Sequence, residues 1–133
     1  MANIVVAVVA HAPLASALKS VAEHVFGGAV NLTAIDVLPG ACVDESTDGL
    51  LHRVAGLDQG SGVLLMTDLP GASPANICVR ASHRARERGH QCSVVAGVNA
   101  SMILRTLNYP TAVMSEMLEN ALSGAQQTIN TLD

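Results

Sequence analysis

The first dozen residues constrain the fold of this chain more than any other stretch. Residues 4–10 form a continuous apolar run that ends abruptly at His11. A short run of this kind is typical of a strand buried on both faces of a parallel sheet. Pro13 suits the first position of a helix, because the N–H that it lacks would have no partner there. His11 is therefore expected in a turn between a central strand and a helix, which is where open α/β sheets bind ligands.

The composition predicts a core of aliphatic side chains in a single domain, residues 1–133. Half of the residues are hydrophobic, yet the chain has one Phe, one Tyr and no Trp. Such a core suits a parallel sheet that helices cover on both faces, and the length suits one domain. The formal net charge is −4, and only seven residues are Lys or Arg. No nucleic-acid partner is expected, because nucleic acids bind a concentrated basic face.

The cysteines and the N-terminal segment exclude further classes of protein. Cys42, Cys78 and Cys92 are far apart and form no Cys-x-x-Cys pair and no Cys/His ligand spacing. Neither a zinc site nor a disulfide framework is expected. The apolar run of residues 4–10 is too short to span a membrane, and no basic segment precedes it, so it is interpreted as a strand and not as a signal. The sequence predicts a cytoplasmic protein with no metal, no cofactor and no direct membrane insertion.

Helical and strand patterns alternate along the rest of the chain. Helices are predicted over residues 13–26, 46–57, 73–88, 100–107 and 113–128, and further strands over 30–38, 63–67 and 93–98. Gly49 and Gly56 weaken the second helix, and Ser123 with Gly124 is expected to interrupt the last one. Ser73 and Asn99 are candidate helix caps. This order of elements predicts a three-layer α/β domain with an open, mostly parallel sheet and helices on both faces.

Two predicted strands end in a titratable residue and are followed by a helix that starts at proline. His11 precedes Pro13, while Asp68 follows the strand over residues 63–67 and precedes Pro74. If the first and third strands are neighbours, the strand order reverses between them and a crevice opens at their carboxyl ends. His11 and Asp68 would then face each other at the mouth of that crevice.

A carboxylate beside a histidine ring has a definite chemical use. An Asp that accepts a hydrogen bond from Nδ1–H fixes the tautomer and leaves a lone pair on Nε2, which can attack a phosphoryl group. The N–H groups at the helix starts after Pro13 and Ser73 are suited to bind the resulting negative charge. Gly71 would let the loop backbone approach closely, and the Ser73 hydroxyl could donate another hydrogen bond.

Other chemistries fit the sequence less well. The Gly-x-Ser-x-Gly elbow, the Walker phosphate loop and the Gly-x-Gly-x-x-Gly fingerprint are all absent from the sequence. Phe26 and Tyr109 offer little aromatic surface for a flavin. His11 and Asp68 alone are too few ligands for a metal ion.

Several segments together resemble the IIA component (EIIA) of the mannose/fructose class of the bacterial phosphoenolpyruvate-dependent sugar phosphotransferase system (PTS). These segments cover nearly the whole chain: the strand that ends in His11, Ile35-Asp36 before Pro39-Gly40, residues 63–67 followed by Asp68-Leu-Pro-Gly-Ala-Ser-Pro-Ala-Asn, and residues 95–99. The most specific feature is the pattern Asp-x-x-Gly-x-Ser-Pro-x-Asn combined with an early histidine.

The resemblance implies a flavodoxin-like sheet, a homodimer and a phosphohistidine relay. His11 would accept a phosphoryl group from the phosphocarrier protein HPr and pass it to a IIB component, for sugar uptake or regulation. Asp68 matches the family's carboxylate beside the histidine. Gly71, Ala72 and Ser73 match the loop that binds the phosphoryl group. In known members a strand can be exchanged between subunits, but the sequence does not locate such a strand here.

The chain departs from the family pattern at three positions. Ala10 replaces a hydroxyl residue, and Ala12 and Ala72 replace glycines. These changes, and the lack of a IIB segment in this sequence, motivate an alternative function. The alternative is a regulatory interaction module that signals by its phosphorylation state without onward sugar phosphorylation. The phosphocarrier subunit of a dihydroxyacetone kinase ranks lower, and a flavin-binding flavodoxin ranks lowest.

Overall fold

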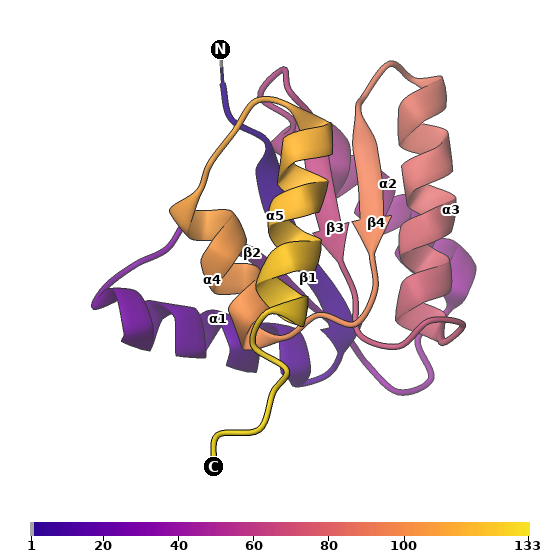
Figure 1. Ribbon diagram of the computed structural model, residues 1–133. Coiled ribbons are helices and arrows are strands. Elements are labelled where there is room, and N and C mark those ends of the chain that lie inside the picture. Colours follow the sequence, from indigo (N-terminus) through magenta and orange to yellow (C-terminus); the bar gives the residue numbers. More distant parts are fainter. Residues whose placement is uncertain (1) are drawn as a thin grey trace.

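A computed structural model describes residues 2–133 of the chain (Figure 1). The elements are, in order, β1 (Val5–His11), α1 (Leu14–Phe26), β2 (Thr33–Val37), α2 (Val43–Leu57), β3 (Val63–Met66), α3 (Ser73–Glu87), β4 (Cys92–Val95), α4 (Ala100–Asn108) and α5 (Met114–Gln126). The strands form one sheet in the order β2-β1-β3-β4, and every neighbouring pair is parallel. The predicted flavodoxin-like α/β fold is confirmed.

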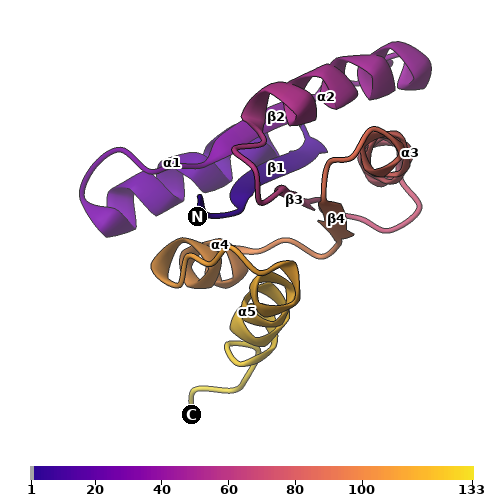
Figure 2. The same ribbon diagram turned by 90° about the horizontal axis from the view of Figure 1, so that it is seen from above.

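Helices cover both faces of this sheet, and Figure 2 shows α2 and α3 on one side with α4 and α5 on the other. Alternate side chains of β1 enter two separate apolar clusters. Val6 and Val8 pack with α1, α4 and α5, whereas Val5 and Val9 pack with α2 and α3. The strand is continuously apolar because both of its faces are buried.

The topological switch point of the sheet, where the strand order reverses, lies between β1 and β3. These two strands are neighbours, with Val5 of β1 opposite Val63 of β3 and Val8 opposite Met66. The chain leaves β1 for α1 on one face of the sheet and leaves β3 for α3 on the other face. The two loops therefore diverge at the carboxyl edge, which is the geometry that opens a crevice in a doubly wound sheet.

Several predicted boundaries are wrong by a few residues. Helix α2 begins at Val43, before the predicted start at residue 46, because Asp44 and Glu45 in its first turn favour a helix N-terminus. Strand β2 is shorter than predicted at both ends. Strand β4 stops at Val95, because the chain turns at Gly97, whose φ of 79° lies in the left-handed region.

The predicted interruption of the last helix is also wrong, since α5 continues through Ser123 and Gly124. A Cβ atom at Gly124 would lie 2.5 Å from the Cβ of Arg105 and 3.1 Å from the carbonyl oxygen of Ser101. Glycine stands at this position because α5 packs closely against α4, and not because the helix breaks.

The predicted helix starts are shifted by one residue in two cases. Pro13 is the N-cap of α1 instead of its first residue, and Ser73 is the first residue of α3 instead of its cap. Asn99 caps α4 as predicted, because its side-chain oxygen accepts a hydrogen bond from the Met102 N–H at 2.9 Å. Within residues 2–133, no helix has the length and apolar character needed to cross a membrane.

Candidate functional site

His11 and Asp68 meet at the carboxyl edge of the sheet. Nδ1 of His11 lies 2.7 Å from Oδ2 of Asp68, and the backbone N–H of His11 donates to the same oxygen at 3.1 Å. The other carboxylate oxygen, Oδ1, accepts a hydrogen bond from the Leu69 N–H at 2.9 Å. Both oxygens are thus held in place, and the strand order brings the two side chains together as expected from the sequence.

The segment that carries Asp68 is tied to the loop after β4. The Thr67 N–H donates to the Val95 carbonyl at 2.8 Å, and the Asp68 carbonyl accepts from the Gly97 N–H at 2.8 Å. The Val98 N–H donates in turn to the Thr67 carbonyl at 3.0 Å. These backbone hydrogen bonds join the segment after β3 to the segment after β4. They hold the backbone of Asp68 in position, and with it the carboxylate.

Electrostatics favour the ionised form of Asp68. Burial of the side chain, which is 10% exposed, opposes ionisation, but hydrogen bonds from the His11 ring, the His11 N–H and the Leu69 N–H outweigh it. Together they hold the pKa of Asp68 below its ordinary value of 3.8. The His11 side chain is 47% exposed. Because an ionised carboxylate can only accept hydrogen bonds, we assign the ring proton to Nδ1, which leaves the Nε2 lone pair free.

The predicted phosphate-binding residues form the link from Asp68 to α3. Gly71 has a φ of 82°, which favours glycine, whereas Ala72 has φ −80° and ψ 169°, which any residue adopts. The Ala72 carbonyl accepts from the Asn76 N–H. Among the described residues, the Ser73 hydroxyl, the Ser73 N–H and the Ala75 N–H have no hydrogen-bond partner. No hydrogen bond within residues 2–133 joins Gly71, Ala72 or Ser73 to His11.

Asp36 has a role that sequence reasoning missed. It lies in β2 opposite Ala10, and its carboxylate accepts hydrogen bonds from the Ser16 hydroxyl at 2.6 Å and the Ser16 N–H at 3.2 Å. It therefore caps the first turn of α1 from the neighbouring strand. The start of α1 was expected to offer free N–H groups to an anion, but this is wrong for Ser16, whose N–H already donates to Asp36. The Ser73 and Ala75 N–H groups at the start of α3 have no such acceptor among the described residues. The family resemblance includes Ile35-Asp36 but implies no role for Asp36.

A second His–Asp pair, also absent from the sequence predictions, lies at the amino edge of the sheet. Nδ1 of His90 is 2.7 Å from Oδ2 of Asp58, and Oδ1 of Asp58 accepts from the N–H groups of Gly60 and Gly62. Burial opposes ionisation of Asp58, but these hydrogen bonds from His90, Gly60 and Gly62 hold its pKa below the ordinary value of 3.8. This pair joins the turn before β3 to the turn before β4.

Metal-binding clusters and reactive thiols contribute nothing to the site at His11. Within residues 2–133, no three His, Cys, Asp or Glu side chains gather into a group able to hold a metal ion. Cys78, the cysteine in α3, is buried, and burial raises the pKa of its thiol to about 12. It therefore stays protonated at neutral pH.

Comparisons with known proteins point to one family. Residues 4–122 match the family described as PTS system fructose IIA component. The mannose-specific EIIAB component of the PTS from Escherichia coli (strain K12) is 33% identical over 105 residues, which make up 79% of this chain. The corresponding protein of Shigella flexneri matches equally well. The chain spans only about a third (31%) of the length of these curated relatives.

Solved structures share the fold over nearly the whole chain. The PTS component EIIA from Streptococcus agalactiae superposes with a TM-score of 0.84 at 19% identity, covering 96% of each chain. The mannose/sorbose-specific IIA subunit from Enterococcus faecalis gives a TM-score of 0.86 at 17% identity, covering 99% of this chain and 96% of that one. At these identities the structures support the fold alone. The sequence matches go further, and by them the chain belongs to the EIIA family of fructose- and mannose-type PTS components.

Proposed function

We propose that this chain carries phosphoryl groups on His11, accepting them from phospho-HPr and passing them to a IIB component. The observation that carries the proposal is the 2.7 Å contact between Nδ1 of His11 and the Asp68 carboxylate. It commits Nδ1 as a donor and leaves Nε2 as a nucleophile on an exposed ring. Membership of the EIIA family supports a transferase-type role for the same site.

The proposed relay has two displacement steps. In the first, the Nε2 lone pair attacks phosphorus, a bond between Nε2 and phosphorus forms, and the donor leaves with the electron pair of the broken bond. In the second, a nucleophile of the IIB component attacks the same phosphorus, and His11 leaves as a neutral imidazole. Asp68 holds the ring in position and stabilises the positive charge that develops on it when Nε2 forms its bond.

Gly71, Ala72 and Ser73 are the proposed binding residues for the phosphoryl group. The Ser73 hydroxyl and the N–H groups of Ser73 and Ala75 are donors without an internal acceptor among the described residues. They lie at the start of α3, where the helix dipole favours an anion. Ala72 replaces a family glycine without backbone strain, since its φ is −80°. That departure therefore leaves the loop able to adopt its conformation.

The experiment that tests the proposal is incubation with phosphoenolpyruvate, enzyme I and HPr, followed by mass measurement. Wild type is expected to gain one phosphoryl group that is acid-labile and base-stable, and His11→Ala is expected to gain none. His90→Ala is the matched control, because His90 has an aspartate at the same 2.7 Å from Nδ1 but lies at the opposite edge of the sheet. Equal labelling of wild type and His11→Ala would contradict the proposal.

The regulatory alternative is separated by a second stage of the same experiment. It is motivated by Ala10, Ala12 and Ala72, which differ from the family pattern around the histidine and the loop. Phosphorylated protein is mixed with candidate IIB components. Passage of the phosphoryl group supports the relay, whereas stable phosphoprotein that binds a partner without transfer supports the regulatory module. The homodimer, the cytoplasmic location and the single-domain boundary of 1–133 stay predictions.

A further inference from the structure

The start of α1 has no cap of its own. Pro13 stands at the N-cap position and makes no side-chain hydrogen bond there. The Ser16 N–H, in the first turn, instead donates to Oδ1 of Asp36 at 3.2 Å, and the Ser16 hydroxyl donates to Oδ2 at 2.6 Å. A helix usually obtains this acceptor from its own N-cap side chain. Here the acceptor comes from β2, 20 positions further along the chain.

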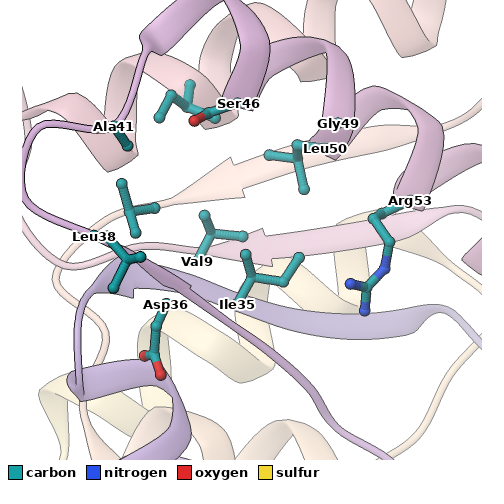
Figure 3. A pocket seen from close by; sticks show the side chains of 11 residues that line it. Val9, Ile35, Asp36, Leu38, Ala41, Ser46, Gly49, Leu50 and Arg53 are labelled. Carbon is teal, nitrogen blue, oxygen red and sulfur yellow. The ribbon is translucent and has the colours of Figure 1, made fainter.

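Asp36 reaches α1 from a position beside the histidine. In the sheet register Asp36 lies opposite Ala10, and the next residue, Val37, lies opposite His11. Figure 3, a close view of the hollow between α2 and β2, shows Ile35 pointing into the hollow and the Asp36 carboxylate pointing away from it. The carboxylate thus lies on the face of the sheet that α1 covers, next to the end of β1.

Two neighbouring residues of β2 hold the turn that follows His11. The Val37 carbonyl accepts a hydrogen bond from the Ala12 N–H at 3.0 Å, and the Asp36 carboxylate accepts both hydrogen bonds from Ser16. The turn between Ala12 and Ser16 is therefore anchored at both ends to the strand that pairs with β1. A cap within the turn would stabilise α1 as well, but it would not attach the turn to the sheet.

The Asp36 carboxylate and Ser16 depend on each other. Within residues 2–133, no Lys, Arg or His nitrogen lies within 4 Å of this carboxylate, and the hydrogen bonds that it accepts come from Ser16. The Ser16 hydroxyl also lies 3.2 Å from the carbonyl oxygen of Pro13, which belongs to the same turn. Loss of either partner therefore removes this attachment of the turn to β2.

We propose that Asp36 and Ser16 form a brace that positions His11 for phosphoryl transfer. The inference rests on the proposed function. Asp68 orients the histidine from β3, while the brace fixes the following turn from β2, on the other side of β1. Asp36 and Ser16 are positioning residues, and neither needs to contact the phosphoryl group. A displacement of a reacting group by about 1 Å can slow a reaction about 10²-fold, so loss of the brace is expected to slow the chemical step.

The test compares Asp36→Ala with Asp36→Asn, and Ser16→Ala with Ser16→Thr. Alanine removes the side-chain hydrogen bonds at either position, whereas threonine keeps the hydroxyl. Asparagine can still bind Ser16, because its oxygen accepts from the N–H and its amide group donates to the hydroxyl oxygen. For the two alanine variants, kcat for transfer from phospho-HPr is expected to fall about tenfold while KM stays unchanged. Asp36→Asn and Ser16→Thr are expected to keep most of the wild-type kcat.

Phosphoramidate, a small phosphoryl donor, tests whether the effect lies in the chemistry at His11. It needs no protein contact, so both alanine variants are expected to be labelled about tenfold more slowly by it as well. Thr111→Val is the control, because the Thr111 hydroxyl donates to the Glu116 carboxylate at 2.7 Å near the start of another helix, α5. This control is expected to keep the wild-type rates with both donors. Circular dichroism at the assay temperature checks that every variant is folded.

The possible outcomes separate the brace from the proposed function. Wild-type kcat in the folded alanine variants would overturn the inference and leave the proposed function standing. An equal loss in Asp36→Asn and Asp36→Ala would contradict it too, because the effect would then come from the charge of Asp36 and not from the brace. A higher KM for phospho-HPr with unchanged phosphoramidate labelling would refute it as well, since the variants would then impair donor binding. Failure of wild type with both donors would overturn the proposed function itself.

Discussion

At the scale of the residue, a single oxygen of Asp68 controls the geometry of His11. Oδ2 accepts hydrogen bonds from both the ring Nδ1–H and the backbone N–H of His11, while Oδ1 is held by Leu69. The ring is therefore fixed relative to its own backbone as well as to the neighbouring strand. This arrangement limits rotation of the imidazole and directs Nε2 away from Asp68.

Replacement of Asp68 by asparagine tests this control. The asparagine amide has a similar size, but it carries no charge. Its single oxygen cannot accept all the hydrogen bonds that the two carboxylate oxygens of Asp68 accept from His11 and Leu69. We expect the rate of phosphoryl transfer to His11 to fall about 10²- to 10⁴-fold, by analogy with loss of an orienting aspartate in other histidine sites. Rapid-quench measurement of transfer from phospho-HPr gives the rate. Asp58→Asn, which alters the partner of His90, is the control, and an unchanged rate in Asp68→Asn would refute the role.

At the scale of the element, glycines in helices serve different purposes. Gly124 of α5 lies against Arg105 and Ser101 of α4, where a side chain has no room. Gly49 and Gly56 of α2 face open space. The sequence pattern alone treats all three as weak points of a helix, because helix propensity carries no information about a neighbouring helix.

The packing of α4 against α5 predicts opposite effects of alanine at two of these glycines. Gly124→Ala is expected to destabilise the protein by about 1–3 kcal/mol, because its Cβ collides with the base of the Arg105 side chain and a backbone carbonyl. Gly56→Ala is expected to stabilise it by up to about 1 kcal/mol through helix propensity. Urea unfolding followed by circular dichroism measures both. Equal stability of the two variants would show that α4 and α5 do not pack this closely.

At the scale of the whole molecule, local sequence patterns predict the fold, but they do not predict most of the contacts between residues that are far apart in the sequence. The apolar run that ends in His11 indicated a central parallel strand, and the alternation of patterns indicated the layered fold. The meeting of His11 and Asp68 followed from that topology. The Asp36 bond to Ser16 and the pair of Asp58 with His90 join residues 20 and 32 positions apart. Such contacts leave no periodic signal in the sequence, so only the assembled fold reveals them.

The two His–Asp pairs stand at opposite edges of the sheet, and both matter to the stability of the whole fold in acid. The carboxyls of Asp58 and Asp68 have pKa values below 3.8 in the folded chain, because hydrogen bonds to the ionised forms outweigh the effect of burial. An unfolded aspartate has a pKa of about 3.9. The unfolded chain therefore binds more protons in this range, and the stabilisation is present above about pH 4 and lost as pH falls through the folded values.

Asp58→Asn tests the contribution of Asp58 to the pH dependence of the unfolding free energy. At pH 7 the variant is expected to lose about 1–3 kcal/mol of unfolding free energy, because the N–H groups of Gly60 and Gly62 and the His90 ring lose their charged acceptor. Below about pH 4 the aspartate of the unfolded wild-type chain binds a proton, which removes this stabilisation, so the difference between the two proteins should shrink. Urea unfolding at pH 7, 5, 4 and 3 measures that difference. A gap that stays constant down to pH 3 would mean that the charge on Asp58 does not stabilise the fold, and that the turns before β3 and β4 are held by their backbone contacts instead.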